Sequence, residues 1–175
     1  MHTELNSMLE QSVLGETPGR ILLSTKEQHR EAAAHLATQA NRRISLFTYD
    51  LDAPVYDQPS FLDAIKRLAI QSQHSKISIL LQNNQRVQRN GHRLVRLMRQ
   101  LPSRIELRRP HPDYIDHPEN FLIVDGVGYI QRELYTRYEG VIDFYAPLEV
   151  QRLEEFYLEV WERSEPDSEL RRLSL

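Results

Sequence analysis

The chain has 175 residues, of which 40% are hydrophobic and 27% are charged, and its formal net charge is -3. These values are typical of one soluble globular domain and argue against a general polyanion binder. Cysteine is absent, which excludes disulfides and thiolate metal sites. The sequence shows no secretory signal pattern, and no apolar run approaches the roughly 18 residues of a membrane span. We therefore expect a cytoplasmic protein without membrane insertion.

Residues 1–19 are polar and predict a flexible N-terminal arm. Beyond them, apolar residues recur alternately at the period of strands and at the period of helices. The strands are predicted at 20–23, 44–49, 76–82 and 104–108, with a helix after each of the first three. Strands that alternate with helices predict a mixed, mostly parallel α/β sheet flanked by helices.

The clearest local signal is the stretch 119–132, ENFLIVDGVGYIQR. Its Asp-Gly pair at 125–126 favours a β-hairpin, because glycine tolerates positive φ and aspartate can bond its own backbone. The four consecutive apolar residues 121–124 predict a strand that is covered on both faces. A C-terminal helix is predicted to start at Pro147, and residues 165–175 are predicted to form a polar C-terminal tail.

The run NFLIVDG resembles the end of the phospholipase D signature, His-x-Lys-x4-Asp, which commonly reads HxKFxIVDG. The match holds at Phe121, Ile123, Val124, Asp125 and Gly126. The resemblance implies a phospholipase D-like domain at residues 20–164, equivalent to one half of a complete enzyme of this family. Such an enzyme uses two signatures, so a chain with one copy is expected to form a homodimer.

The same alignment shows a degenerate signature. Pro118 stands at the histidine position and Asn120 at the lysine position. In the family, the histidine attacks phosphorus and the lysine neutralises phosphate charge. Downstream, the family pattern Gly-Ser-x-Asn is replaced by residues 132–135. The weak catalytic candidates that remain are His117 and Asp125, and the candidate ligand-binding residues near the hairpin are Asn120, Asp125 and Arg132.

The two catalytic candidates have structural alternatives. Asp125 is better read as a plain hairpin-turn residue than as a functional group. His117 is one residue from the family position and should point to the opposite face of the strand. A one-residue bulge would re-aim it, but Glu119 would then replace the lysine. The nearby loop contains His111, Asp113, Asp116 and His117. Because prolines restrict this loop, we expect neither a metal site nor a cofactor.

Four arginines recur on one side of a helix that is predicted to run from Asn83 or Asn84 to Leu101. They are Arg86, Arg89, Arg93 and Arg96. The planar guanidinium suits phosphate, so this face is a candidate surface for nucleic acid or a phosphorylated ligand. The alternatives are a solvated face, or pairing with the acidic C-terminal helix of the same or another subunit. Aromatic residues do not interleave with the arginines, which argues against single-stranded nucleic acid.

These features predict a non-catalytic binding or regulatory module for a phosphate-bearing ligand or a protein partner. One alternative is a divergent phosphodiesterase or nuclease of the phospholipase D superfamily. Another is an accessory domain of an acetyltransferase system, because similar bacterial sequences can be attached to acetyltransferase domains. The chain itself shows no acetyl-coenzyme A loop.

Overall fold

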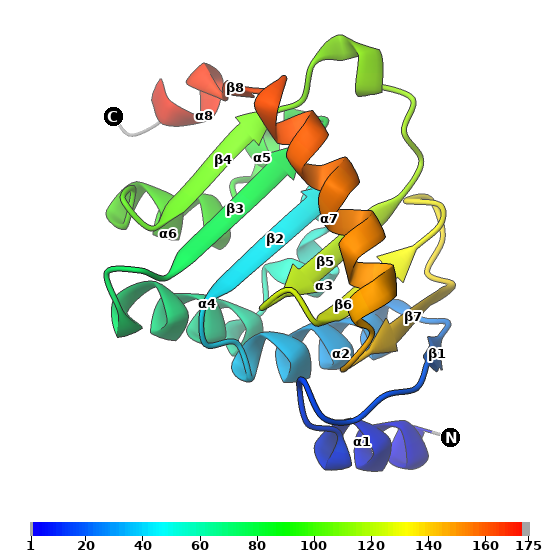
Figure 1. The fold of residues 1–175 in the computed structure, drawn as a ribbon. Coiled ribbons are helices and arrows are strands. Elements are labelled where there is room, and N and C mark those ends of the chain that lie inside the picture. The colour runs from blue at the N-terminus through cyan, green and yellow to red at the C-terminus, as the bar shows by residue number, and fades with distance from the viewer. Residues whose placement is uncertain (1, 173–175) are drawn as a thin grey trace.

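The computed structural model describes residues 2–172. An eight-stranded sheet forms the middle layer, and its strands lie in the order β1-β7-β6-β5-β2-β3-β4-β8 (Figure 1). The strands are β1 (Ile21–Leu23), β2 (Arg43–Thr48), β3 (Lys76–Leu81), β4 (Ile105–Arg109), β5 (Asn120–Val124), β6 (Gly128–Arg132), β7 (Gly140–Asp143) and β8 (Glu165–Pro166). The mixed α/β fold that the sequence predicted is confirmed.

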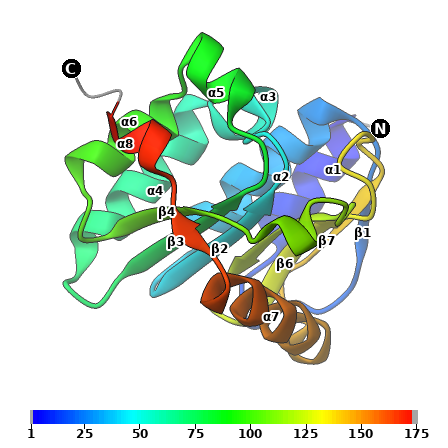
Figure 2. The ribbon, with the colours of Figure 1, turned by 90° about the horizontal axis from the view of Figure 1, so that it is seen from above.

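The helices form two outer layers. They are α1 (His2–Gln11), α2 (Lys26–Thr38), α3 (Ala53–Tyr56), α4 (Pro59–Gln71), α5 (Gln85–Asn90), α6 (Arg93–Gln100), the 3-10 turn η1 (Pro112–Tyr114), α7 (Pro147–Glu162) and α8 (Ser168–Arg172). Helices α2, α4 and α6 lie on one side of the sheet, and α7 lies on the other (Figure 2). None of the helices in the described part of the chain has the length and apolar character needed to cross a bilayer.

The hydrophobic core is divided by the sheet into two clusters. In the larger cluster, the helices from α1 to α6 pack against one face of the sheet. Leu36 and Leu68 are fully buried in this cluster. The smaller cluster lies under α7 and includes Phe47, Phe121 and Leu153. The strands β2, β3 and β5 are central, as their apolar sequences predicted, because a strand with apolar residues on both faces needs cover on both.

The predicted hairpin forms at the Asp-Gly pair, where Asp125 has φ 53° and Gly126 has φ 72°. Strand direction differs from the expectation of a mostly parallel sheet. Of the seven strand pairings, β2–β3 and β3–β4 are parallel and the other five are antiparallel. The physical reason is that short connections such as β5 to β6 and β6 to β7 permit only antiparallel neighbours, whereas a parallel pair needs a crossover.

Both ends of the chain differ from the prediction. The expected flexible arm contains α1, whose Leu5 and Leu9 are buried against the core. Their spacing of four residues places both side chains on one face of the helix. At the C-terminal end, residues 165–172 form β8 and α8, and Leu170 is fully buried. The expected tail is therefore packed as far as the description reaches, and residues 173–175 lie outside it.

The helix predicted up to Leu101 is interrupted. The backbone leaves the α-helical region at Gly91, where φ is 72°, and α6 then starts after His92. The His92 Nδ1 atom accepts a hydrogen bond from the Leu94 N–H at 3.1 Å, which caps the new helix. Glycine stops the first helix because it adopts positive φ without steric cost. The four arginines are consequently divided between α5 and α6.

Candidate functional site

The start of β5 is the position at which the phospholipase D signature would place its chemistry. Because β5 runs antiparallel to β2, Asn120 lies beside the loop that follows β2. Its side chain is 3% exposed, and its Oδ1 atom accepts a hydrogen bond from the Tyr49 N–H at 3.0 Å. Asn120 thus satisfies a backbone donor of the protein and is turned away from solvent. We call Asn120 and the buried polar network beside it the β5 corner.

Arg132 is the cross-strand neighbour of Asn120 and is also buried. Its guanidinium forms an ion pair with the Asp52 carboxylate at 2.6 Å. It also donates hydrogen bonds to the carbonyl oxygens of Tyr135 at 2.5 Å and Arg137 at 2.7 Å. The guanidinium carbon lies 4.4 Å from the centre of the Tyr138 ring. The positive charge of Arg132 is therefore paired and hydrogen-bonded by other groups of the protein.

Tyr138 completes this network. Its hydroxyl donates a hydrogen bond to Asp52 at 3.0 Å. Burial, together with the neighbouring Asp52 carboxylate, raises the pKa of Tyr138 to about 12. Neither Asp52 nor Tyr138 was singled out from the sequence. Asp52 lies 80 residues before Arg132, so no local spacing could have indicated the pair.

Tyr135 lies next to the β5 corner and is half-buried. It stands where the family pattern has asparagine, and its ring stacks on Tyr49 at 3.9 Å between centroids with 11° between the ring planes. Its backbone N–H donates a hydrogen bond to the Pro118 carbonyl at 2.7 Å. A stacked tyrosine pair thus lies beside the corner, because the Tyr49 N–H bonds to Asn120 and the Tyr135 carbonyl accepts from Arg132.

Asp125 lies at the opposite end of β5, so the structure does not bring it together with Asn120 or Arg132. Its carboxylate is 7% exposed and accepts hydrogen bonds from the three successive backbone N–H groups of Asn41, Arg42 and Arg43 at 2.8 to 2.9 Å. These bonds join the hairpin to the turn before β2. The geometry supports the interpretation of Asp125 as a turn residue.

His117 points to the side of the sheet that α7 covers. Its ring stacks on Phe156 with centroids 4.3 Å apart and meets the edge of Phe47 at 5.2 Å. The Nε2 atom lies 3.5 Å from the Glu119 carboxylate, which is long for a hydrogen bond. His117 beside it holds the pKa of Glu119 below its usual range. His117 and Asn120 therefore lie on opposite faces, as strand alternation predicted.

His111 and Asp113 in the loop before β5 are engaged at the surface. Asp113 accepts a hydrogen bond from Arg163 at 2.7 Å, and that arginine holds the pKa of Asp113 below its usual range. His111 Nδ1 accepts a hydrogen bond from the Asp113 N–H at 3.1 Å. Among the residues that were searched, which are those the structure describes, no three such side chains converge in a group suited to a metal ion.

Two of the four arginines of α5 and α6 form ion pairs within the described part of the chain, and the other two do not. Arg86 forms an ion pair with Asp50 at 3.2 Å, and Arg93 forms one with Asp57 at 2.5 Å. Arg89 and Arg96 are exposed and have no ionic partner within residues 2–172. Pairing with the acidic α7 of the same chain is wrong, because α7 lies on the other side of the sheet (Figure 2).

The mixed sheet with helices on both faces and the hairpin at the Asp-Gly pair agree with the phospholipase D-like fold that the sequence predicts. A family model described as Domain of unknown function (DUF7931) matches residues 25–173, and the chain belongs to that family. No curated protein matches the chain.

Similar solved structures support the fold assignment. Nuc from Salmonella typhimurium, a phospholipase D family member, has a TM-score of 0.64 and 18% identity over 86% of this chain and 98% of its own. NucT from Helicobacter pylori has a TM-score of 0.60 and 10% identity over 85% and 99%. TrmBL2, an archaeal chromatin protein whose structure shows a novel mode of DNA binding, has a TM-score of 0.64 and 18% identity. That match covers 95% of this chain but 60% of TrmBL2.

Proposed function

We propose that this chain is a non-catalytic binding module of phospholipase D-like fold that recognises a phosphate-bearing ligand. The observation that carries the proposal is the β5 corner. The nucleophile position holds Pro118, and the lysine position holds Asn120, whose side chain is bonded to the backbone. Proline has no group that can attack phosphorus, so the covalent route of the family is closed at this position.

The buried ion pair of Arg132 also supports a non-catalytic module. For Arg132 to reach a phosphate, it would have to leave the Asp52 carboxylate, 2.6 Å away and buried. Separating such a pair leaves an unpaired buried charge, which costs about 3–5 kcal/mol. His117 lies on the opposite face and cannot act on a ligand held beside Asn120.

Arg89 and Arg96 are the residues that we assign to phosphate recognition, because both are exposed and neither guanidinium is engaged by a described carboxylate. The DNA-binding chromatin protein among the structural neighbours supports nucleic acid as the ligand. We include in the proposal a homodimer and a cytoplasmic location. The dimer follows from the single signature copy, and sedimentation of the purified protein tests it.

Hydrolysis of bis(p-nitrophenyl) phosphate tests the non-catalytic part. The purified protein is expected to give no turnover above background. Turnover that disappears in a His117→Ala variant would refute the proposal and identify a divergent phosphodiesterase.

Binding of a short DNA duplex tests the ligand. Each phosphate contact releases counterions, so affinity should fall steeply as salt rises. Charge reversal of Arg89 and Arg96 to glutamate should abolish binding and leave the melting temperature almost unchanged. Reversal of the exposed Lys26 and Arg137 changes the net charge equally and should retain most of the affinity. Equal losses in the two double variants, or no salt-sensitive binding by the parent, would refute the assignment.

A further inference from the structure

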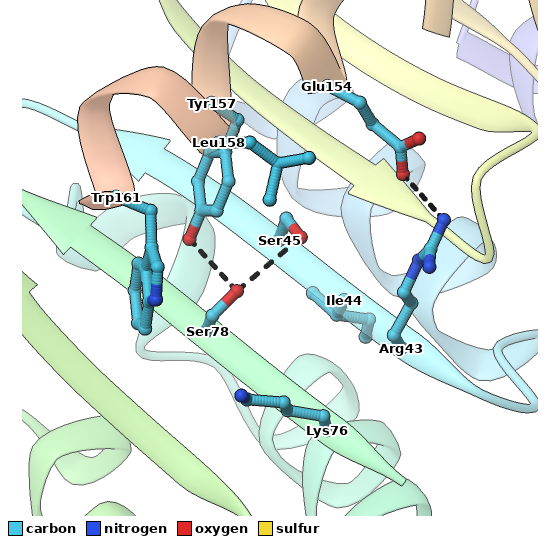
Figure 3. A pocket seen from close by; sticks show the side chains of 9 residues that line it. All are labelled: Arg43, Ile44, Ser45, Lys76, Ser78, Glu154, Tyr157, Leu158 and Trp161. Atoms are coloured by element: carbon cyan, nitrogen blue, oxygen red, sulfur yellow. Dashed lines mark hydrogen bonds and ion pairs between the residues drawn. The ribbon is translucent and has the colours of Figure 1, made fainter. Parts of the chain in front are cut away.

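A groove lies beside α7, over the first residues of β2 and β3 (Figure 3). It encloses about 180 Å³. Helix α7 crosses the sheet obliquely and leaves the starts of these two strands uncovered (Figure 1). We call this hollow the α7 groove. It is at the opposite end of β2 and β3 from the β5 corner and uses none of the same side chains.

The floor of the α7 groove is a four-residue polar array. Strands β2 and β3 pair in register, so that Arg43 stands opposite Lys76 and Ser45 stands opposite Ser78. Residues two apart on a strand share a face, and all four side chains therefore line the groove. Like charges directly opposite each other destabilise a sheet. A bound anion would offset the repulsion between Arg43 and Lys76.

The two cations of the array differ in their partners. Arg43 donates to the Glu154 carboxylate of α7 at 2.9 Å, and this ion pair closes one end of the groove (Figure 3). Lys76 is exposed and has no ionic partner among residues 2–172. One positive charge is therefore left for a ligand.

The hydroxyls of the array form a directed chain. The Tyr157 hydroxyl donates to Ser78 Oγ at 3.0 Å, and Ser78 Oγ donates to Ser45 Oγ at 3.4 Å (Figure 3). Burial raises the pKa of Tyr157, so the phenol stays protonated and acts as the first donor. Because each hydroxyl carries one proton, the Ser45 hydroxyl is left free to donate into the groove.

The wall of the groove is apolar and comes from α7. Tyr157 and Trp161 lie with their rings 18° from parallel, and Leu158 beside them is 58% exposed. The guanidinium of Arg108 lies 4.6 Å from the centre of the Trp161 ring and holds it in place. Pockets for drug-sized ligands are larger, at roughly 300–1,000 Å³, so this groove suits a smaller molecule.

We propose that the α7 groove binds a small organic anion. The anionic head group lies against Lys76 and the Ser45 hydroxyl, and a flat apolar body lies against Leu158 and Trp161. This site is independent of the arginines of α5 and α6, which lie on the other side of the sheet.

Phenyl phosphate is a suitable probe, and Trp161 is the reporter because it is the only tryptophan of the chain. Titration is expected to change its fluorescence saturably with a Kd of about 1 mM, the range for a ligand of about ten non-hydrogen atoms. Lys76→Gln should weaken binding by about fivefold or more, because it removes the charge that faces the head group. Lys26→Gln removes an exposed lysine from the opposite side of the sheet and should bind like the parent.

Three results would overturn the proposal. They are an unsaturable response of the parent, equal binding by Lys76→Gln and the parent, and equal affinity for phenyl phosphate and inorganic phosphate. The last result would mean that the apolar wall contributes nothing. The Arg89→Glu/Arg96→Glu variant should bind phenyl phosphate normally, so the outcome here is separate from that of the DNA-binding proposal.

Discussion

The two ends of β2 and β3 use polar side chains in opposite ways. In the β5 corner, Asn120 and Arg132 are buried and bonded to other groups of the protein. In the α7 groove, Lys76 is exposed without an ionic partner among the described residues, and the Ser45 hydroxyl keeps a proton to donate. A side chain that is already bonded to another group of the protein must break that contact before it can bind a ligand. The comparison shows that residue type alone does not identify a binding site.

Removal of Asp52 should have the largest effect, because it leaves Arg132 charged and unpaired inside the β5 corner. Asp52→Ala is expected to lower the free energy of unfolding by about 3–5 kcal/mol. Asp57→Ala breaks the exposed pair with Arg93 and should cost less than about 1 kcal/mol. Chemical denaturation of both variants measures the difference. Similar losses would show that the corner is not closed as described.

Protonation of His29, which is bonded to Tyr138 of the β5 corner, should make the stability of the protein depend on pH. Its Nε2–H donates to the Tyr138 carbonyl at 2.7 Å, and burial lowers the pKa of His29 to about 4 from an ordinary 6.5. The unfolded chain therefore binds the proton more readily. The stability that neutral His29 contributes is fully present above pH 6.5. It is lost as the pH falls towards 4, which lowers the free energy of unfolding by about 3 kcal/mol. Denaturation of the parent and of His29→Gln across this range should show that the variant lacks this contribution. Parallel pH profiles would contradict the assignment.

Asp125 tests the turn interpretation. Asp125→Ala leaves three backbone donors without their acceptor and should cost about 2–3 kcal/mol. Asp125→Asn keeps one acceptor oxygen and tolerates positive φ, so its cost should be smaller. Thermal denaturation ranks the two variants. An alanine variant as stable as the parent would reopen a functional role for this carboxylate.

Tyr157→Phe should have the smallest effect. It removes the hydroxyl that starts the chain to Ser78, and one such hydrogen bond contributes about 1 kcal/mol. The variant sharpens the comparison because it changes the α7 groove and leaves the β5 corner intact. Its free energy of unfolding, measured beside that of Asp52→Ala, should show the smaller loss. A loss as large as that of Asp52→Ala would mean that the groove is as tightly constrained as the corner.

Local sequence patterns predicted the central strands and the Asp-Gly hairpin, because burial on both faces and the turn each leave a short-range signal. They predicted the parallel direction of β2, β3 and β4 but not the antiparallel pairing of β5 with β2, which is set by the path of the loop before β5. The short β8 and the fully buried Leu170 of α8 also depend on contacts made far along the chain.

The sites were less predictable than the fold. The pair of Arg132 and Asp52 and the array of Ser45 and Ser78 depend on which strands become neighbours and in which register. The spacing of residues along the sequence indicates neither which strands are neighbours nor their register. The arginines of α5 and α6 were visible in the sequence, but Gly91 alters their arrangement by ending the first helix.

Backbone amide chemical shifts during a phenyl phosphate titration test the contrast between the two regions most directly. The largest shifts are expected at Ser45, Lys76 and Ser78, and the amides of Asn120 and Arg132 should stay unchanged. Shifts that concentrate at Asn120 and Arg132 would contradict this expectation, because they would place ligand binding in the corner that the protein closes with its own side chains.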